Sequence, residues 1–455
     1  MLFLEINSLI VKVTMPSKLP DYVKASIPIP PDKRAPWYKN TFPSYAGIFL
    51  WVGFYLGIAG PTLDQGTVAA CMLGLVVAGL LCFALYYYVP GMLGMQTGRT
   101  LYIVGTSTFG TTGGYVMPGL LMGLLQLGWI AVGTWISADF ILKGLHKDSK
   151  TLFTGIVLVW VYGLAWVAIK GIKYVAKVAQ VLNWVPLIMI VIVFWANRDG
   201  IPNYRPTHPD PWSGFLATLA VVIGFFATAG AAGTDFGMSN RNRGDVFWGG
   251  LTGITLPIIV AGGLPILAVA GYIGSSGDRA NYAYTVAIAH VGVLAPVMFF
   301  LFAAASVVPV CFSSFIAANS FATMLPKIPR TVSTLIGVTL SAVLAITGIA
   351  QNLVGFFTIV GASFGPICGA MVADYLLAGK KWSGPRRGIN WAGYAAWAIG
   401  FAVGILGSIP GVPSSWVQAD RPAVLFSFLV GFAVYYLLSI AGIRPEVVPP
   451  EELSR

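Results

Sequence analysis

The chain has 455 residues, of which 57% are hydrophobic and 9% are charged. Soluble domains carry roughly 25% charged residues, so this composition cannot cover a water-facing surface and excludes most soluble classes. The net charge of +11 would suggest nucleic acid in a soluble protein. In a membrane protein it is the expected excess of basic residues in cytoplasmic loops, so no nucleic-acid partner is predicted.

Residues 1–43 are mixed polar and basic, without the long apolar run of a cleavable signal, and we expect a cytoplasmic tail. After this tail, stretches long enough to cross about 30 Å of hydrocarbon recur along the chain. We predict an all-α polytopic membrane protein with about twelve transmembrane helices, at 44–61, 66–90, 113–142, 152–170, 174–196, 213–234, 247–273, 283–322, 331–349, 352–378, 390–410 and 422–442.

The eighth stretch is too long for one crossing, so we expect an interfacial piece followed by a span that begins near Val293. Residues 44–378 are predicted to form a ten-helix core, and 379–442 to hold two accessory helices. Residues 443–455 are then a cytoplasmic tail. With the N-terminus inside, twenty of the 27 basic residues lie on the cytoplasmic side. This bias favours an even number of spans in the plasma (bacterial inner) membrane, with both termini in the cytoplasm.

Glycine and proline interrupt two corresponding spans, the first and the sixth. The run 52–57 precedes Gly60 and Pro61, and the run 223–228 precedes Gly230 and Gly233. Interruptions at corresponding positions are typical of transporters built from two inverted repeats, here spans 1 to 5 and 6 to 10. A helix opened at membrane depth exposes backbone groups that only an ion or a solute can satisfy, so the pattern predicts a site. Close helix packing is the alternative reading of these glycines.

Polar residues inside predicted spans also indicate a site. In the third span, Gln126 and Trp129 share a helix face and offer an amide beside an indole plane, which suits a flat heteroaromatic ring. An interhelical hydrogen bond and a packing tryptophan would explain them equally well. In the eighth span, Ser313 and Ser314 supply hydroxyls that suit a small alkali cation, although serine commonly bonds back to its own helix.

Acidic groups are almost absent from the apolar segments. Asp64, Asp139, Asp235 and Asp374 lie near span ends, where a cap or an interface anchor is the simpler interpretation. Lys177 could substitute for a coupling cation, but snorkelling to the interface is the commoner fate. The histidines show no metal-site spacing, so neither an enzyme nor a cofactor is predicted. A passive channel and an amino-acid or amine transporter remain as rivals.

Several motifs resemble the nucleobase and cation symporter family of cytosine permeases, purine carriers and hydantoin transporters. The resemblance runs from about Lys39 to Asp374, over GPTLDQG at 60–66, GMQTG at 94–98, QLGWIAVG at 126–133, VIGFFATAGAAGTDF at 222–236, AANSFATMLPKIPR at 317–330 and VADYLL at 372–377. It implies a LeuT-type fold with a 5+5 inverted repeat plus two C-terminal helices. A monomer would suffice, and the solute would be a small heterocycle such as cytosine or a purine.

The resemblance also implies site residues. A base would lie between Trp129 and an aromatic residue of the sixth span, Phe226. Its hydrogen bonds would come from Gln126, from the backbone of Gly224 or Phe225, and from Thr228 and Asn319. Sodium would be bound by the carbonyls of Phe49, Val52 and Val310 with the hydroxyls of Ser313 and Ser314. Proton coupling is the alternative to sodium. The identity of the base also stays open, and a vitamin-precursor pyrimidine is an alternative, because Phe315 replaces an asparagine of several relatives and Phe226 replaces the tryptophan of the hydantoin carrier.

Overall fold

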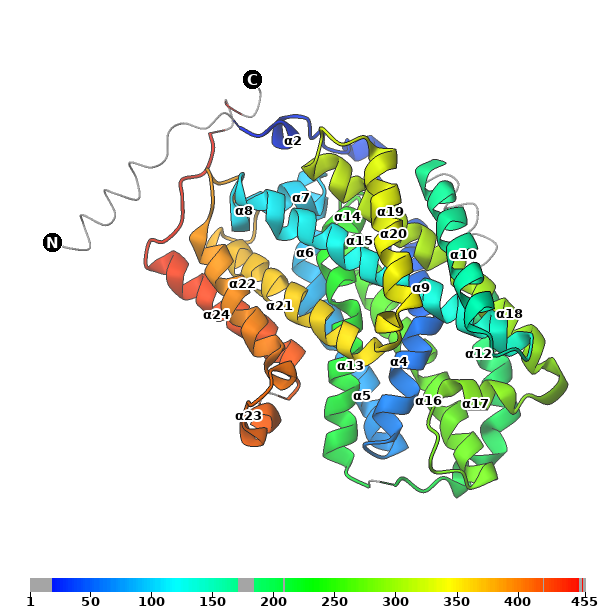
Figure 1. The fold of residues 1–455 in the computed structure, drawn as a ribbon. Helices are drawn as coiled ribbons and strands as arrows, with labels where there is room; N and C mark the ends of the chain where they lie inside the picture. Colours follow the sequence, from blue (N-terminus) through cyan, green and yellow to red (C-terminus); the bar gives the residue numbers. More distant parts are fainter. Residues whose placement is uncertain (1–18, 171–183, 208, 420, 450–451, 453–455) are drawn as a thin grey trace.

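Figure 1 shows the computed structural model of the chain, which describes residues 19–170, 184–207, 209–419, 421–449 and 452. Within these residues the regular structure is helical, and β-pairing is limited to two isolated bridges, Ala35 with Asn240 and Arg386 with Val447. Eight helices are long and apolar enough to span a membrane, and a bent pair makes a ninth. Two further apolar helices, Lys150–Trp166 and Arg330–Ile346, are shorter. The fold is therefore that of an all-α polytopic membrane protein.

The first span is broken, as predicted. It consists of α3 (Thr41–Phe49) and α4 (Val52–Leu63), which meet at an angle of 54°. Trp51 has an extended backbone (φ −80°, ψ 135°) and is the N-terminal cap residue of α4. Its carbonyl accepts the first hydrogen bond of that helix, from the Phe54 amide at 2.9 Å. The break thus precedes the glycine-rich run 52–57, and Pro61 lies inside α4.

The sixth span is continuous where a break was expected, so that prediction is wrong. Helix α13 runs through the run 223–228 as Pro211–Ala231, and only Ala232 separates it from α14 (Gly233–Gly237). Gly224 serves close packing: a Cβ there would lie 2.7 Å from the carbonyl oxygen of Phe357. Packing against the tenth span is therefore the physical reason for this glycine.

The first and sixth spans run antiparallel, as inverted repeats require. At one end, the hydroxyl of Tyr45 in α3 donates to the carbonyl of Ala229 near the end of α13, at 2.9 Å. At the other end, Gly66, just after α4, lies against Gly214 near the start of α13. The two segments are therefore side by side over their whole length.

The other predicted spans each contain a helix. The second is α5 (Val68–Leu81), a π-helical segment (Cys82–Tyr87) and α6 (Tyr88–Thr97), followed by the short α7 (Leu101–Val104) and α8 (Thr106–Phe109). The third is α9 (Leu121–Gly144) with the turns before it from Gly113, and the fourth is α10 (Lys150–Lys170). The fifth is described from α12 (Trp184–Asn197) onward, so Lys177 lies outside the described residues. The seventh is α15 (Arg243–Gly250), a π-helical segment (Leu251–Thr255) and α16 (Leu256–Ser276).

The eighth segment divides as expected. A separate short helix, α17 (Tyr284–Ala289), comes first, and the span then starts at Gly292 and continues through α18 (Ala295–Ala305) and α19 (Val307–Met324). The ninth and tenth spans are α20 (Arg330–Ile346) and α21 (Leu353–Leu377). The last two contain α22 (Trp391–Gly404) and α24 (Ala423–Ile440), with α23 (Ser414–Ala419) between them. The helices are thus consistent with twelve spans.

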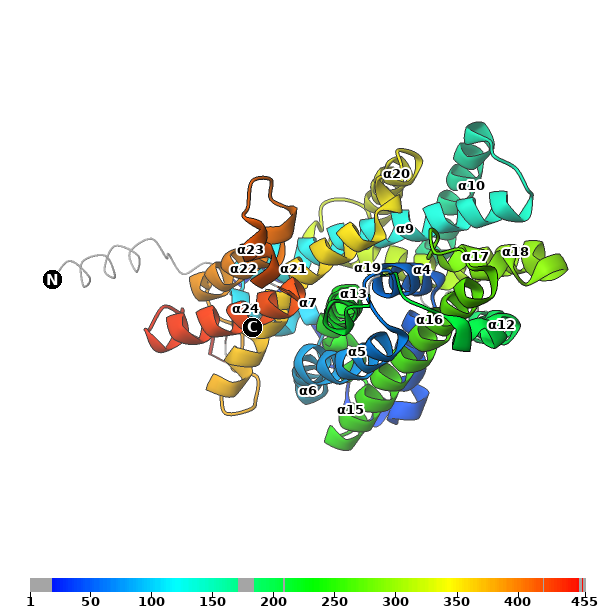
Figure 2. The same cartoon turned by 90° about the horizontal axis from the view of Figure 1, so that it is seen from below.

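The helices form two packed groups. Helices α4, α5, α13 and α16 pack on one another and are called the first group here; α9, α10, α19 and α20 form the second group. Helix α21 packs against α13, and α22 and α24 cover its other side (Figures 1 and 2). The two groups meet where α9 approaches α4 and α13.

A buried ion pair holds the last helices to α21. Arg386 and Asp374 are both buried, with Nη2 and Oδ1 3.3 Å apart. The hydroxyl of Tyr435 in α24 donates to the same carboxylate at 2.9 Å. The guanidinium also donates to the carbonyls of Ser107 at 2.9 Å and Pro445 at 3.1 Å. Asp374 is therefore part of a buried network rather than a simple cap or interface anchor.

The segment 19–40 lies across the end of the bundle at the top of Figure 1, where α2 (Asp21–Lys24) is labelled. Arg34 fixes it there, because its Nη1 donates to the carbonyl of Met95 in α6 at 2.6 Å and its Nη2 to that of Ile29 at 3.2 Å. Nearby, the Asn40 amide donates to the carbonyl of Phe236 in α14 at 2.9 Å. The segment is thus attached to the second and sixth spans.

Replacing Arg34 with alanine is expected to release this segment. Hydrogen bonds from charged groups contribute about 1.5–3 kcal/mol each, so chymotrypsin should cut at Trp37 and Tyr38 roughly tenfold faster than in the wild type. Limited proteolysis in detergent measures the rate. Lys33→Ala removes a neighbouring, exposed cation and serves as the control. Equal cleavage of both variants would show that Arg34 does not hold the segment.

Candidate functional site

Gln126 and Trp129 lie on the face of α9 that meets α13. Both are buried, with exposed fractions of 5% and 7%. The Trp129 Nε1 donates to the Thr228 hydroxyl of α13 at 3.3 Å, and the Gln126 Nε2 lies 3.4 Å from the Met122 sulfur one turn back. A thioether is a weak acceptor, so the amide of Gln126 is poorly satisfied. The structure thus joins two predicted residues, Trp129 and Thr228, across the third and sixth spans, and Gln126 lies one turn from Trp129 on α9.

The aromatic ring that faces Trp129 is Phe225, not the predicted Phe226. The centroids of Trp129 and Phe225 are 5.2 Å apart in an edge-to-face contact. The Phe226 ring instead stacks on Phe49 of α3, with centroids 5.7 Å apart and planes at 16°. Successive residues of an α-helix point about 100° apart, so only one of two adjacent phenylalanines can face α9. In this conformation Phe225 rather than Phe226 contacts Trp129, and the predicted placement of a base between Trp129 and Phe226 stays a prediction.

The rings around Trp129 contact it directly and form an aromatic cluster. Phe356 and Phe357 of α21 contact the indole at centroid distances of 4.8 and 5.6 Å, and Trp51 contacts it at 5.4 Å. A flat ligand between two parallel rings needs them roughly 7 Å apart, because each layer takes about 3.5 Å. In this conformation a ligand can enter between Trp129 and Phe225 only if the rings separate.

The predicted cation ligands come from the broken first span and from α19. Phe49 ends α3 and Val52 begins α4, so both flank the break, whereas Val310, Ser313 and Ser314 are on α19. All five are buried. A Cβ on Gly133 would lie 2.4 Å from Val310 Cγ2 and 3.4 Å from the Trp51 ring. The break and α19 therefore approach the same point of α9.

The family model described as "Permease for cytosine/purines, uracil, thiamine, allantoin" matches residues 28–431, which is most of the chain. The chain belongs to this permease family.

Relatives and solved structures agree with that assignment. The cytosine permease of Escherichia coli K12 is 25% identical over 362 residues, covering 76% of this permease and 80% of the relative. The purine-uracil permease NCS1 of Arabidopsis thaliana is 23% identical over 223 residues, covering 43% and 37%. These relatives are permeases and not enzymes, so the chain is a multi-pass membrane transporter.

Two solved structures share the fold. Mhp1, a nucleobase-cation-symport-1 family transporter in a closed conformation with bromovinylhydantoin bound, has a TM-score of 0.68 at 17% identity, covering 96% of this permease and 98% of that chain. A Na⁺-coupled sialic acid symporter in a substrate-bound outward-open state has a TM-score of 0.61 at 11% identity, covering 95% and 94%. The LeuT-type fold expected from the sequence is confirmed.

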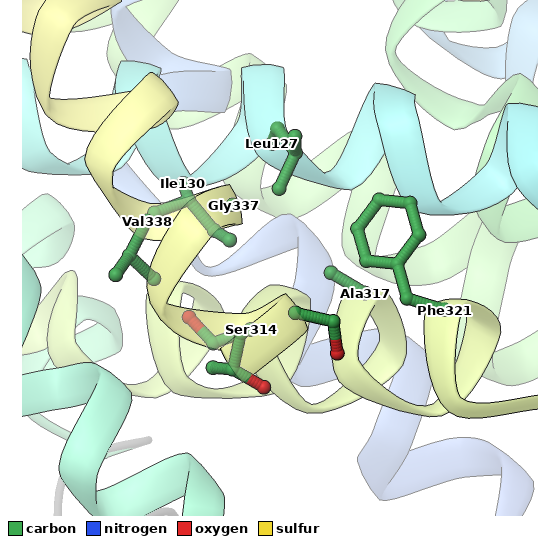
Figure 3. Close-up of a pocket in the computed structure, with 9 residues that line it drawn as sticks. Leu127, Ile130, Ser314, Ala317, Phe321, Gly337 and Val338 are labelled. Atoms are coloured by element: carbon green, nitrogen blue, oxygen red, sulfur yellow. The ribbon is translucent and has the colours of Figure 1, made fainter. Parts of the chain in front are cut away.

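A gap inside the second group of the permease is distinct from the aromatic cluster. Figure 3 shows it between α9, α19 and α20, and it is too small to hold a water molecule. Its hydroxyls are already bonded within their own helices: Ser314 donates to the carbonyl of Val310 at 2.8 Å, and Thr334 donates to that of Arg330 at 2.8 Å. The other lining residues are Leu127, Ile130, Ala317, Phe321, Ser333, Gly337 and Val338. This gap is a packing feature of one helix group.

The structure adds Trp51, Phe356 and Phe357 to the candidate site. Trp51 directly precedes the glycine-rich run of the first span, so its position beside a predicted break could have identified it. The two phenylalanines carry no comparable signal, because aromatic pairs are common in apolar helices. Asn319 is half-buried on α19, and the described hydrogen bonds do not join its side chain to Gln126, Trp129 or Thr228. Its predicted role stays a prediction.

Proposed function

We propose that this permease imports a nucleobase or a related heterocycle by sodium symport with alternating access. The observation that carries the proposal is the junction of Trp129 with Thr228 and Phe225. An indole plane and a hydroxyl meet at this contact between the two helix groups, and we propose that the Gln126 amide, one turn away on α9, adds a further polar group. Aromatic faces bind flat rings, and the polar groups can read the ring edge. The relatives named for cytosine, purine and uracil, and Mhp1 with its bromovinylhydantoin, support a heterocyclic solute.

We propose that a small alkali cation is bound by oxygen donors from the broken first span and from α19. Phe49 and Val52 offer backbone carbonyls beside an interrupted helix, and Ser313 and Ser314 offer hydroxyls from α19. Hard cations take oxygen ligands, and carbonyls at an unwound helix are the usual coordinating groups in transporters of this design. The sodium-coupled sialic acid symporter of the same fold supports this choice of ion.

Coupling follows from the position of these groups. A cation bound between the break and α19 would hold the first group in one orientation relative to the second. The solute would then complete its contacts only when α9 and α13 close around it. Movement of α4, α5, α13 and α16 against α9, α10, α19 and α20 would expose the site to alternate sides. The two groups already pack as separate units in the structure.

The proposed topology places the protein in the plasma membrane, the inner membrane of a bacterial cell, with both termini in the cytoplasm. Residues 44–378 would form the transport core and 379–442 the two accessory spans, flanked by the tails 1–43 and 443–455. The face that carries Arg34, Arg99 and Arg386 would then be cytoplasmic. The excess of basic residues predicted for that side supports this orientation.

Uptake into proteoliposomes tests the function. Radiolabelled cytosine, adenine, hypoxanthine, uracil and hydantoin are offered with and without an inward sodium gradient, and at least one should accumulate only with sodium. No uptake of any of these compounds would refute the substrate class. Equal uptake with a pH gradient and choline in place of sodium would refute the ion.

Ser313→Ala tests the cation site separately. Loss of one oxygen ligand should raise the sodium concentration for half-maximal uptake about tenfold, since 1.4 kcal/mol corresponds to that factor. Ser306→Ala is the matched control, because Ser306 is also buried and its hydroxyl bonds to the carbonyl of Phe302 in the preceding turn. An unchanged sodium dependence in Ser313→Ala would remove this residue from the site.

A further inference from the structure

Trp51 occupies the break between α3 and α4 and is buried, with an exposed fraction of 4%. Its extended backbone turns the side chain back over the next turn, so that a Cβ on Gly53 would lie 2.8 Å from the indole. On the other side the ring lies against Gly133 of α9. The side chain therefore lies between one helix of each group. Its contact with Gly53 depends on glycine, whereas a Cβ on Gly133 would meet the ring at an ordinary van der Waals distance of 3.4 Å.

The Trp51 ring belongs to the aromatic cluster but is oriented differently from its neighbours. Its plane makes an angle of 69° with that of Trp129, at a centroid distance of 5.4 Å, and its centroid lies 6.1 Å from that of Phe225. A flat ring stacked parallel to the Trp129 indole would therefore be steeply inclined to the Trp51 plane. The indole N–H is the one polar group that the Trp51 side chain can offer to the edge of such a ring.

This N–H is buried without a hydrogen-bond partner. Most buried donors in proteins are paired, because an unsatisfied one bears the full cost of losing its hydration. The neighbouring indole of Trp129 is paired, with Thr228. An unpaired donor at a helix break, beside the cluster proposed to receive the solute, is a group that the solute itself can satisfy.

We propose that Trp51 is a specificity-determining residue that donates its indole N–H to a ring carbonyl oxygen of the substrate. The proposal rests on the proposed transport of a heterocycle and narrows the class of solute to bases that carry a ring carbonyl group (oxo-bases). An exocyclic oxygen extends beyond the ring edge and has two lone pairs, so it reaches a donor that lies across that edge. Analogues that lack the oxygen leave the buried N–H unpaired, and the site therefore selects against them.

Inhibition of uptake by paired ligands tests the inference. Cytosine is compared with 4-aminopyrimidine, and hypoxanthine with purine, because the second member of each pair lacks only the oxo group and its tautomeric hydrogen. In the wild type the oxo member should bind about tenfold more tightly, the upper range of one net hydrogen bond. Trp51→Phe keeps an aromatic ring but removes the donor. In this variant the inhibition constants of the two members of each pair should differ by less than about twofold.

Trp160→Phe is the matched control. Trp160 of α10 also has a buried indole N–H without a partner, but it lies in the second group, outside the aromatic cluster. This variant should discriminate between paired ligands like the wild type. Gly53→Ala is a second probe, since its Cβ would displace the Trp51 ring while keeping the N–H, and it should also lose the discrimination.

Three results would overturn the inference. The wild type could bind both members of each pair equally, a measurement that does not depend on any variant folding. Trp51→Phe could keep the wild-type preference, or it could weaken both members by the same factor, which would leave only a packing role. A wild type that takes up no heterocycle would instead refute the proposed function.

Discussion

Replacing Arg386 with methionine is expected to lower the free energy of unfolding by about 3–5 kcal/mol, the cost of leaving one member of a buried ion pair without its partner. The Asp374 carboxylate would stay buried and keep only the hydroxyls of Tyr435 and Ser383. The carbonyls of Ser107 and Pro445 would lose their donors as well. Because these contacts join α21, α24 and the C-terminal segment, the accessory helices should detach first.

A thiol-reactive fluorophore can follow the unfolding, since all four cysteines are buried and free. Arg387→Met is the adjacent control: Arg387 pairs with Glu452, but both side chains are over one-third exposed. An exposed pair contributes about 0–1 kcal/mol, so this variant should unfold close to the wild type. Equal stability of the two variants would show that the buried network does not hold the last helices.

Replacing Trp129 with alanine is expected to weaken substrate binding by about ten- to a hundredfold. Stacking of a base on an aromatic side chain is worth about 1–3 kcal/mol by alanine substitution. The variant also removes the donor to Thr228 and the contacts with Phe225 and Phe356. The concentration for half-maximal uptake of cytosine, or of whichever base the wild type accumulates, measures the effect.

Two further variants separate the parts of this effect. Trp129→Phe keeps a stacking face and loses only the hydrogen bond to Thr228, so it should fall between the wild type and Trp129→Ala. Trp184→Ala removes an exposed indole on α12 and should leave uptake unchanged. If Trp129→Ala transports with wild-type affinity, α9 does not form the substrate site.

The sequence was sufficient to predict the all-α membrane fold and the family. The length of hydrophobic stretches and the order of motifs can be read from the sequence without knowing how the helices pack. The broken first span and the division of the eighth segment were also predictable from local composition. The continuity of α13 was not. Gly224 is compatible both with a break and with a close contact, and only the position of Phe357 decides between them.

The rotation of each helix about its own axis decides which residues contact one another at the candidate site. Packing against neighbouring helices sets this rotation, so the sequence could not show which of Phe225 and Phe226 faces Trp129. The same limit applies to Asp374, whose partner Arg386 is twelve residues away and belongs to a loop. Gln126, Trp129 and Thr228 were predicted because polar and indole groups are rare at such depth and therefore indicate a site from the sequence alone.

The contact of Trp129 with Phe225 and Thr228 affects how tightly any solute can be held. A solute can occupy that position only in molecules whose rings have moved apart. Its measured dissociation constant is therefore the intrinsic value divided by the fraction of such molecules. A small bound ion that increases this fraction would strengthen solute binding without touching the solute. When no solute is bound, the closed rings would leave little route for ions or other solutes to leak through the protein.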